Sequence, residues 1–239
     1  MRISPRFPSP RENRLLAALP PADYERLLSA LQPVTWALGE VVYEPGVFLD
    51  SLYFPLDGIV SLLTLMADGA TVETGMVGND GPVGIALLLS GHATPHRAVV
   101  QVAGHAVRMP GQRAQEAFQR GGPFQRLLLR YTQALLTQIA QTAACNKLHP
   151  LDQRLCRWLL WVCERVKKDE VKLTQEFIAG MLGVWREGVT LAVHDLEAAG
   201  LIRCARGRIT ILNRQALEAR ACECYRVVKA EFNRLLGPI

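Results

Sequence analysis

The chain has 239 residues, a length that exceeds one typical domain and predicts two, each large enough for its own hydrophobic core. No apolar run approaches the roughly 18 residues that a membrane span needs, so we expect no membrane partner. The first residues, MRISPRFPSPRENRLL, are rich in Arg and Pro and lack the apolar segment of a secretory signal, so we interpret them as a disordered lead-in to a cytoplasmic protein. The six cysteines are then expected to be reduced thiols.

Charge is distributed unevenly along the chain. Residues 1–145 contain 11 Arg, no Lys and 11 acidic residues, so their formal charge is zero. Residues 146–239 contain 16 Lys and Arg against 11 acidic residues, which places the entire excess of +5 in this half. A basic domain beside a neutral one points to a polyanionic partner for the first and a different task for the second.

Residues 34–110 contain short β-rich segments separated by Gly, Pro and Asp, such as VTWAL, VVYE, SLYFPL, TVETGMV and HAVRM. This spacing predicts an antiparallel roll or sandwich rather than a βαβ unit. Gly39, Gly46, Gly58 and Gly69 fall at the expected turns, where a positive φ costs glycine nothing.

Two helices are expected after the roll, a short one over 110–120 and a long one over 124–146. The long helix carries a heptad seam of alternating four- and three-residue steps, which begins apolar and becomes polar. We predict that this seam is a homodimer interface formed by Phe124, Leu128, Tyr131, Leu135, Gln138 and Thr142. A second apolar face, made by Leu129, Leu136, Ala140 and Ala143, allows one side of the helix to pack on the roll while the other meets a partner. The alternative is a monomeric helix with one wide apolar stripe.

The His149-Pro150 pair ends the long helix, because the residue before proline is pushed out of the α region. Residues 147–151 are therefore the expected hinge between domains. Asp152 is a candidate cap for a following helix over 152–167, in which Leu155 and Trp158 belong to the buried stripe.

Residues 173–213 predict a winged helix-turn-helix. Thr174 is placed to cap the first helix, and Gly183 ends its apolar pattern. In the second helix Val189, Val193 and Leu196 recur at i, i+4 and i+7 and must face the core, which turns the intervening polar residues outward. Two short strands follow, around the basic tip Ala205-Arg206-Gly207, where a wing would meet phosphate. An ordinary helical hairpin with a solvated charged face is the alternative.

The outward face of the second helix is suited to reading base edges. Arg can bind guanine O6 and N7 together, and Glu can accept a hydrogen bond from cytosine N4. The expected DNA-binding residues are Thr174, Gln175, Trp185, Arg186, Glu187, Thr190, Leu191, His194, Arg206 and Arg208.

The order of a roll containing LGEVVYEPG and LYFPLDGIVSLL, a long heptad-bearing helix, and LTQEFIAGMLGVWREGVTLAVHDLEAAGLI resembles the CRP/FNR family of bacterial transcription regulators over about residues 14–213. The resemblance implies an α+β fold with a cyclic-nucleotide-binding-like β-roll over 14–122, a dimerisation helix over 123–146 and a winged helix-turn-helix over 147–239. It also implies that the roll senses an effector and that Arg186 and Glu187 read the major groove. The expected partners are double-stranded DNA, a second copy of the chain, RNA polymerase and a small anionic effector.

The chain departs from the family in the recognition helix. Trp185 and Gly188 stand where Ser and Thr often flank the Arg-Glu pair. Leu191 stands where the cyclic-AMP receptor type has a base-reading Arg, and its side chain can at most touch a thymine methyl group. We therefore expect an operator sequence different from that of the founding member.

The chain also departs from the family in the sensing domain. Arg97 matches the arginine that binds the cyclic phosphate, but Ile85 occupies the place of the ribose-binding Glu. An apolar side chain cannot accept from a 2′-hydroxyl group, so we expect cyclic AMP to bind weakly or not at all, and we assign no cofactor. An anion site remains open, and the candidate effector-binding residues are Gly84, Ile85, Ala86, Arg97 and Ala98. The alternative is that Arg97 forms a surface or interdomain ion pair.

The sequence assigns no metal ligand and no catalytic residue. The oxygen-sensing branch of the family uses an N-terminal cysteine cluster, and this chain has no cysteine before Cys145. Cys222 and Cys224 lie in a stretch that we interpret as helical, which would separate their sulfur atoms by about 200° around the axis, so we expect packing cysteines. The alternative function is a cupin-like enzyme or small-molecule-binding roll with an accessory winged helix. Its HxH-plus-Glu spacing is absent, which leaves scattered polar histidines at His92, His96 and His105.

Overall fold

The computed structural model describes residues 7–89 and 92–237. The chain divides into two compact units: residues 1–60 and 77–132 form the N-terminal unit, and residues 61–76 and 133–239 form the C-terminal unit. This division cuts the long helix and groups residues 61–76 with the C-terminal half, so it differs from the predicted boundaries at 122 and 146. In the described part of the chain, no helix is both long and apolar enough to cross a membrane.

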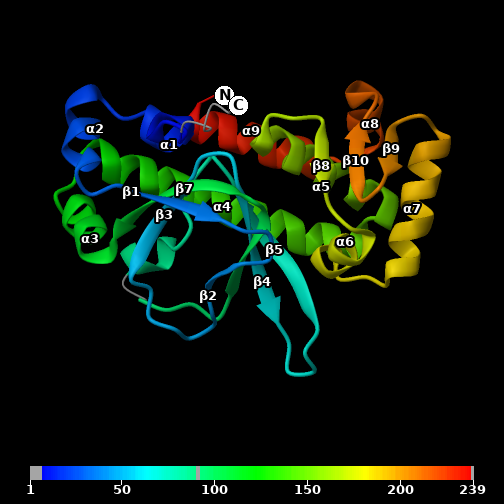
Figure 1. Cartoon of the computed structure of the whole chain (residues 1–239), viewed down its shortest axis with the longest axis horizontal. Helices are drawn as coiled ribbons and strands as arrows, with labels where there is room; N and C mark the ends of the chain where they lie inside the picture. The colour runs from blue at the N-terminus through cyan, green and yellow to red at the C-terminus, as the bar shows by residue number, and fades with distance from the viewer. Residues whose placement is uncertain (1–6, 90–91, 238–239) are drawn as a thin grey trace, which may run out of the picture. The chain divides into compact units, whose positions relative to one another are not determined.

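In its described residues, the β-rich region contains seven strands, as expected from its short β-rich segments. A three-stranded antiparallel sheet has the order β1-β7-β3, and a four-stranded sheet has the order β2-β6-β4-β5. Short helical segments accompany these strands in the chain (Figure 1). The bounds are η1 Pro10–Glu12, α1 Arg14–Ala17, α2 Pro21–Leu28, β1 Gln32–Trp36, β2 Val41–Tyr43, β3 Ser51–Pro55, β4 Ile59–Leu65, β5 Thr71–Val77, η2 Ile85–Leu88, β6 Arg97–Val102, β7 Gly104–Pro110 and α3 Gly111–Gln119.

The interpretation of residues 1–16 as a disordered lead-in is wrong from Phe7 onward, and residues 1–6 lie outside the described part. Asn13 caps α1 by accepting hydrogen bonds from the N–H groups of Leu15 and Leu16. Its side-chain amide donates to the carbonyl oxygens of Pro55 and Gly81 at 3.0 and 3.1 Å. Both leucines are buried, so this segment has a tertiary anchor that local composition does not reveal.

The long helix α4 spans Pro123–Leu148, as predicted within two residues at each end. Its heptad seam, however, faces its own chain, which corrects the predicted dimer interface. The buried seam residues are Phe124, Leu128, Tyr131, Leu135, Gln138 and Thr142.

Three contacts show what covers this seam. A Cβ atom at Gly81 would overlap the ring of Tyr131, so the absence of a side chain there makes room for the ring. Gln138 accepts a hydrogen bond from the N–H of Met76 at 2.8 Å, and Thr142 accepts one from Arg157 at 3.2 Å. The face left in solvent is the second one, where Leu129 and Leu136 are 48% and 62% exposed.

The remainder of the C-terminal unit is a three-stranded sheet of order β8-β10-β9 with helices around it (Figure 1). The elements are α5 Leu151–Val166, β8 Glu170–Lys172, α6 Gln175–Leu182, α7 Arg186–Ala198, β9 Ile202–Ala205, β10 Arg208–Ile211, α8 Arg214–Arg220 and α9 Cys224–Leu236. The α+β fold is confirmed, with β8 as a third strand that the sequence analysis did not predict.

Two local predictions in this unit are wrong. Asp152 does not cap α5, because the cap position is Pro150 and the Asp152 carboxylate accepts from Arg220 at 2.9 Å. The stretch that contains Cys222 and Cys224 is not one helix. The backbone turns to an extended conformation at Ala221, so α8 ends at Arg220 and α9 begins only at Cys224.

A buried carboxyl group on β5 contacts both β4 and α5. Glu73 on β5 accepts hydrogen bonds from the Ser61 hydroxyl at 2.5 Å and from the indole N–H of Trp158 on α5 at 2.9 Å. Burial raises the pKa of Glu73 to about 7, although these hydrogen bonds and the charges of Arg157 and Arg165 oppose the rise.

Candidate nucleic-acid interface and effector site

Helices α6 and α7 form the predicted helix-turn-helix. The Thr174 hydroxyl accepts from the N–H of Phe177 at 3.1 Å and caps α6. Gly183 ends α6 with a left-handed φ of 62°, which an L side chain rarely adopts. Val189, Val193 and Leu196 on α7 are buried, as their spacing predicts. Local capping at both ends therefore fixes α6, whereas the N-cap residue of α7, Trp185, makes no capping hydrogen bond. Each helix also buries one apolar face.

The opposite face of α7 is open. Its exposed side chains are Trp185, Arg186, Glu187, Thr190, Leu191 and His194, with Trp185 84% and Leu191 68% exposed. Within the described residues, neither Arg186 nor Glu187 forms a side-chain hydrogen bond or ion pair. Both charged groups are thus available to an external partner.

One hydrogen bond joins the start of α6 to this face. The Thr190 hydroxyl donates to the side-chain oxygen of Gln175 at 2.8 Å and also lies 3.1 Å from the carbonyl oxygen of Arg186. Thr190 and Gln175 therefore present a single connected polar surface rather than two independent side chains.

Gly188 has a packing role. A Cβ atom there would lie 3.1 Å from a terminal methyl carbon of Leu151, the first residue of α5. The glycine costs roughly 1 kcal/mol of helix propensity relative to alanine, but it lets α7 approach α5 closely. The departure from the family pattern at this position is therefore explained by an internal contact.

The predicted wing is a two-residue hairpin. Ala205 pairs with Arg208, so the loop consists of Arg206 and Gly207, which have positive φ values of 51° and 71°. Two successive positive φ values match the type I′ turn, whose twist suits a hairpin. Arg206 is exposed at the tip.

Arg208 is less free than its sequence position suggests. Its guanidinium forms an ion pair with Glu170 on β8 at 2.7 Å, a partner that the sequence analysis missed along with the strand. A second residue that was not predicted is Arg203, which is exposed on β9 and lies opposite Thr210 in the register. Alternation along a four-residue strand was the available signal, since Ile202 is buried and Arg203 must then point outward.

The effector candidate Arg97 is engaged by a carboxylate. Its Nε atom donates to Glu44 Oε2 at 2.8 Å and its Nη2 atom to Oε1 at 2.5 Å, a bidentate pair between β6 and the residue after β2. This hydrogen bonding holds the pKa of Glu44 below its usual range, so the carboxylate stays charged. The ion-pair alternative for Arg97 is thus the observed one, and an anion would have to displace Glu44.

The other effector candidates give no polar side chain. Gly84 precedes η2 with a left-handed φ of 94°, and a Cβ atom there would lie 3.0 Å from the carbonyl oxygen of Ser51. Ile85 and Ala86 are half-buried in η2, and Ala98 is buried on β6.

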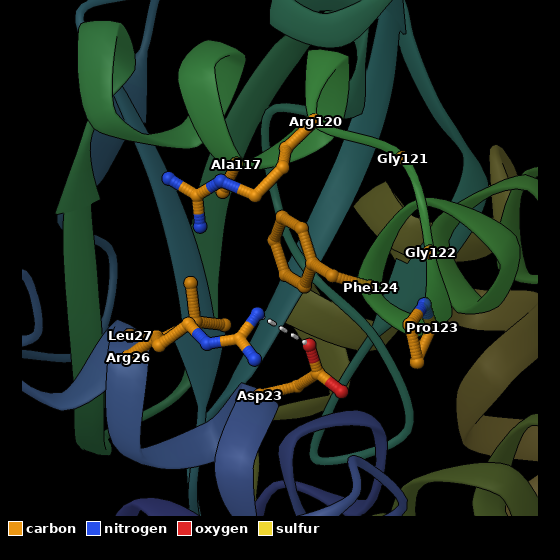
Figure 2. A pocket seen from close by; sticks show the side chains of 9 residues that line it. All are labelled: Asp23, Arg26, Leu27, Ala117, Arg120, Gly121, Gly122, Pro123 and Phe124. Carbon is orange, nitrogen blue, oxygen red and sulfur yellow. Dashed lines mark hydrogen bonds and ion pairs between the residues drawn. The ribbon is translucent and has the colours of Figure 1, made fainter.

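A small pocket of the N-terminal unit is lined by basic side chains and the start of α4 (Figure 2). Arg26 and Arg120 line it, and Arg26 is paired with Asp23 at 3.3 Å. Its volume is about 210 Å³, below the roughly 300–1,000 Å³ of typical small-molecule sites. This pocket is therefore too small to be an alternative to the nucleotide site predicted around Arg97.

The histidines of the roll do not converge on one point. His92 contacts the Gln115 amide at 3.3 Å, His96 contacts the Thr94 hydroxyl at 2.9 Å, and His105 pairs with Asp57 at 3.0 Å. Each has a separate partner, which argues against the cupin-like arrangement of metal ligands.

Two segments of the chain match known domain families. Residues 33–120 match the cyclic nucleotide-binding domain, and residues 153–220 match the Crp-like helix-turn-helix domain. The chain is 23% identical over 218 residues to the Global nitrogen regulator of Synechocystis sp., an alignment that covers 86% of this chain and 95% of that protein.

Solved structures show the same fold. FixK2 from Bradyrhizobium japonicum superposes with a TM-score of 0.69 at 18% identity, covering 80% of this chain and 98% of that one. A CRP-family transcriptional regulator from Thermus thermophilus gives a TM-score of 0.65 at 24% identity, covering 79% and 96%. Since the roll and the helix-turn-helix each match the corresponding domain, the chain belongs to the CRP/FNR family of transcription regulators, which carry a helix-turn-helix DNA-binding domain.

Proposed function

We propose that this protein is a homodimeric, sequence-specific regulator in which α7 enters the major groove and the β9–β10 hairpin contacts phosphate. The observation that carries the proposal is the division of α7 into a buried apolar face and an open face led by Arg186 and Glu187. Neither charged group has a partner in the described part of the chain, so DNA would not have to compete with an internal ion pair.

The roles follow from the chemistry of each group. Arg186 is suited to a bidentate contact with guanine and Glu187 to accepting from cytosine N4. Trp185 and Leu191 add exposed apolar surface at the same face, which suits thymine methyl groups and sugar. Gln175, held against Thr190, would bring the start of α6 to the backbone.

The wing supplies electrostatic affinity. Arg206 at the hairpin tip and Arg203 on β9 are exposed and would contact phosphate, which orients the domain without reading sequence. Arg208 would contribute less, because Glu170 already balances its charge.

The dimer interface that we propose is the exposed apolar face of α4. Leu129 and Leu136 are seven residues apart and therefore lie on one stripe, with Ala140 and Ala143 continuing it. Small residues toward the C-terminal end allow two helices to approach closely. The seam first predicted for this role is already covered by the chain itself.

The sensing domain is proposed to respond to something other than cyclic AMP. The Glu44 carboxylate is already paired with the Arg97 guanidinium and would repel a cyclic phosphate. The side chain of Ile85 offers no acceptor to a ribose hydroxyl group. The supporting observation is the ion pair of Arg97, the residue that the resemblance matches to the phosphate-binding arginine of nucleotide-binding members.

Selection of binding sites from random duplex DNA tests the proposal. A dimer that uses α7 should enrich a pseudo-palindrome with half-site centres about one helical turn apart, roughly 10 to 11 base pairs. Binding to the selected site should weaken steeply with salt because phosphate contacts release counterions. Enrichment of a single asymmetric half-site, or affinity that does not change with salt, would contradict the proposal.

A further inference from the structure

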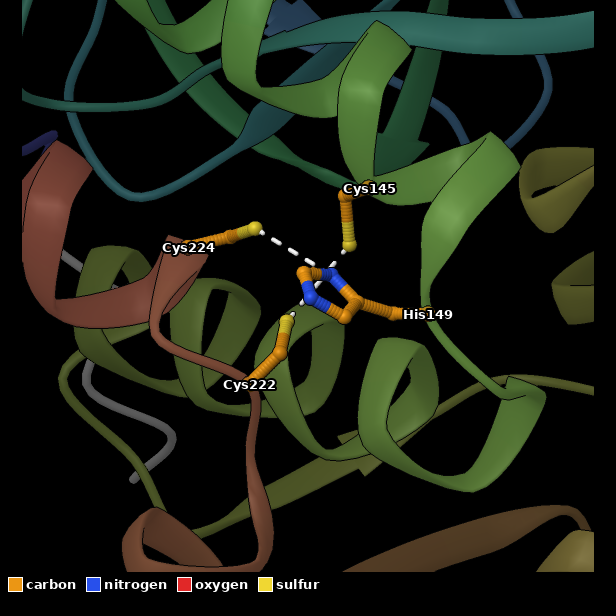
Figure 3. A group of neighbouring side chains, drawn as sticks. All are labelled: Cys145, His149, Cys222 and Cys224. Atoms are coloured by element: carbon orange, nitrogen blue, oxygen red, sulfur yellow. Dashed lines mark hydrogen bonds between the residues drawn. The ribbon is translucent and has the colours of Figure 1, made fainter.

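Three cysteines and a histidine converge in the C-terminal unit. Cys145 lies in the last turn of α4, and His149 follows it by one helical turn, just beyond the end of that helix. Cys222 lies in the extended break between α8 and α9, and Cys224 is the first residue of α9 (Figure 3). The break brings both thiols of the C-x-C pair to one side, which a continuous helix would prevent.

The spacing of the four ligand atoms fits a single metal ion. The Sγ atoms of Cys145 and Cys222 lie 3.5 Å apart, and Cys224 Sγ lies 3.5 Å from His149 Nδ1. In a tetrahedral zinc site, with Zn–S bonds of about 2.3 Å and Zn–N bonds of about 2.0 Å, neighbouring ligand atoms are about 3.5 to 3.8 Å apart. All four atoms here lie within 4.8 Å of one another, so the widest pairs would close by about 1 Å on binding.

A second layer of polar groups orients these ligands. His149 Nδ1 faces the sulfur atoms, while its Nε2 lies 3.3 Å from a carboxylate oxygen of Glu223. Metal-bound histidines usually donate their other ring N–H to a carboxylate, which fixes the tautomer and raises ligand basicity. Gln141 donates to the sulfur of Cys224 at 3.2 Å, a further hydrogen bond that stabilises a thiolate.

Burial and charge also suit a metal-thiolate centre. The three cysteines are buried, and His149 is only partly exposed. Buried Arg157 donates to Thr142, stacks over Trp161 and forms no direct ion pair with a carboxylate in the described part of the chain. Its charge acts on both Cys145 and Cys222. Three thiolates around a divalent cation carry a net charge of about −1, which a buried guanidinium would balance.

We propose that Cys145, His149, Cys222 and Cys224 bind one Zn²⁺ ion, which joins the end of α4 to the start of α9. Ligands of the Cys₃His type select zinc among the common divalent ions and close all four positions, so the site is structural. All four residues lie outside the two segments, 33–120 and 153–220, that match the domain families.

Two other uses of the cluster are less favoured by the geometry. A disulfide between Cys145 and Cys222 would need the sulfur atoms to close from 3.5 Å to about 2.05 Å. It would also not account for the contacts of His149, Glu223 and Gln141 around Cys224. In an iron–sulfur cluster the cysteine thiolates bind several iron atoms, which need more space than one ion. Here the four ligand atoms lie within 4.8 Å of one another and leave room for one ion.

The test is metal analysis of the full-length protein purified under reducing conditions without chelator. Elemental analysis should find about one zinc per chain, and Cys224→Ser should lower that value to well under half. Cys204→Ser is the matched control, because Cys204 lies on β9 outside the cluster and its loss should leave the zinc content unchanged. Cobalt(II) added to metal-free wild type should give the intense visible absorption of a tetrahedral cobalt–thiolate centre.

Two variants keep the inference testable if Cys224→Ser does not fold. His149→Cys preserves four ligands and should retain zinc, while Glu223→Gln should weaken zinc affinity about 10- to 100-fold in a competition titration without changing the stoichiometry at saturation. Wild type that holds no zinc and takes up no cobalt would overturn the site. So would equal zinc content in the Cys224→Ser and wild-type proteins, or a Cys145–Cys222 disulfide in place of metal under these conditions.

Discussion

Replacement of Glu73 by glutamine should change how stability depends on pH. The folded-state pKa of this carboxyl group is raised by burial from 4.5 to about 7, so the folded protein holds a proton that the unfolded chain has released. The stabilisation is complete below the unfolded-state pKa and is lost as the pH rises through about 7. At 1.36 kcal/mol for each pKa unit, the full effect is about 3 kcal/mol.

The glutamine variant keeps the geometry but cannot ionise. Its carbonyl oxygen can accept from Trp158 Nε1, and its amide can donate to the Ser61 hydroxyl. Urea unfolding of both proteins between pH 5 and 8 provides the measurement, and the difference between them removes contributions that they share. We expect the free energy of unfolding of wild type to fall relative to Glu73→Gln by about 2 to 3 kcal/mol across this range, since part of the full effect is already lost at pH 5. Parallel curves for the two proteins would refute the reasoning.

Two further predictions concern assembly and the effector. Leu136→Asp should yield monomers in sedimentation velocity, because the exposed area of Leu129 and Leu136 in two protomers amounts to roughly two leucine side chains, whose burial contributes about 4 kcal/mol. The control Leu38→Asp changes a comparably exposed leucine outside α4 and should stay dimeric. Dissociation of both variants, or of neither, would reject the interface. Calorimetry with cyclic AMP should show binding weaker than micromolar, and Glu44→Gln should strengthen that binding by freeing Arg97. Tight binding to wild type would show that neither the ion pair nor the replacement of the ribose-binding Glu by Ile85 prevents nucleotide binding.

The helix-turn-helix was predictable because its signals are local. A hydroxyl cap at Thr174, a glycine in the left-handed region at Gly183 and apolar residues at helical spacing lie within about two turns of the positions that they determine. The hairpin tip at Arg206-Gly207 was predictable for the same reason. The likeness of these motifs to one family then extended the prediction to the β-roll.

The features that sequence analysis missed depend on contacts far apart in the chain. Two apolar faces run along α4, and their spacing alone does not say which is covered; the structure decides this through Gly81, whose missing side chain leaves room for Tyr131. The pair between Arg97 and Glu44 joins residues 53 positions apart. The break before Cys224 has no Pro or Gly to mark it, so the helical pattern conceals the cluster of thiols.

In the proposed complex, Arg186 reads a base while Arg206 contacts only phosphate. The decisive measurement is the affinity of Arg186→Ala and Arg206→Ala for the selected operator and for unrelated DNA over a range of salt concentrations. Arg186→Ala should lose about 1 to 3 kcal/mol on the operator and almost nothing on unrelated DNA. Arg206→Ala should weaken both and reduce the salt slope by about one. Equal losses on both DNAs for Arg186→Ala would contradict the assignment of α7 as the recognition helix.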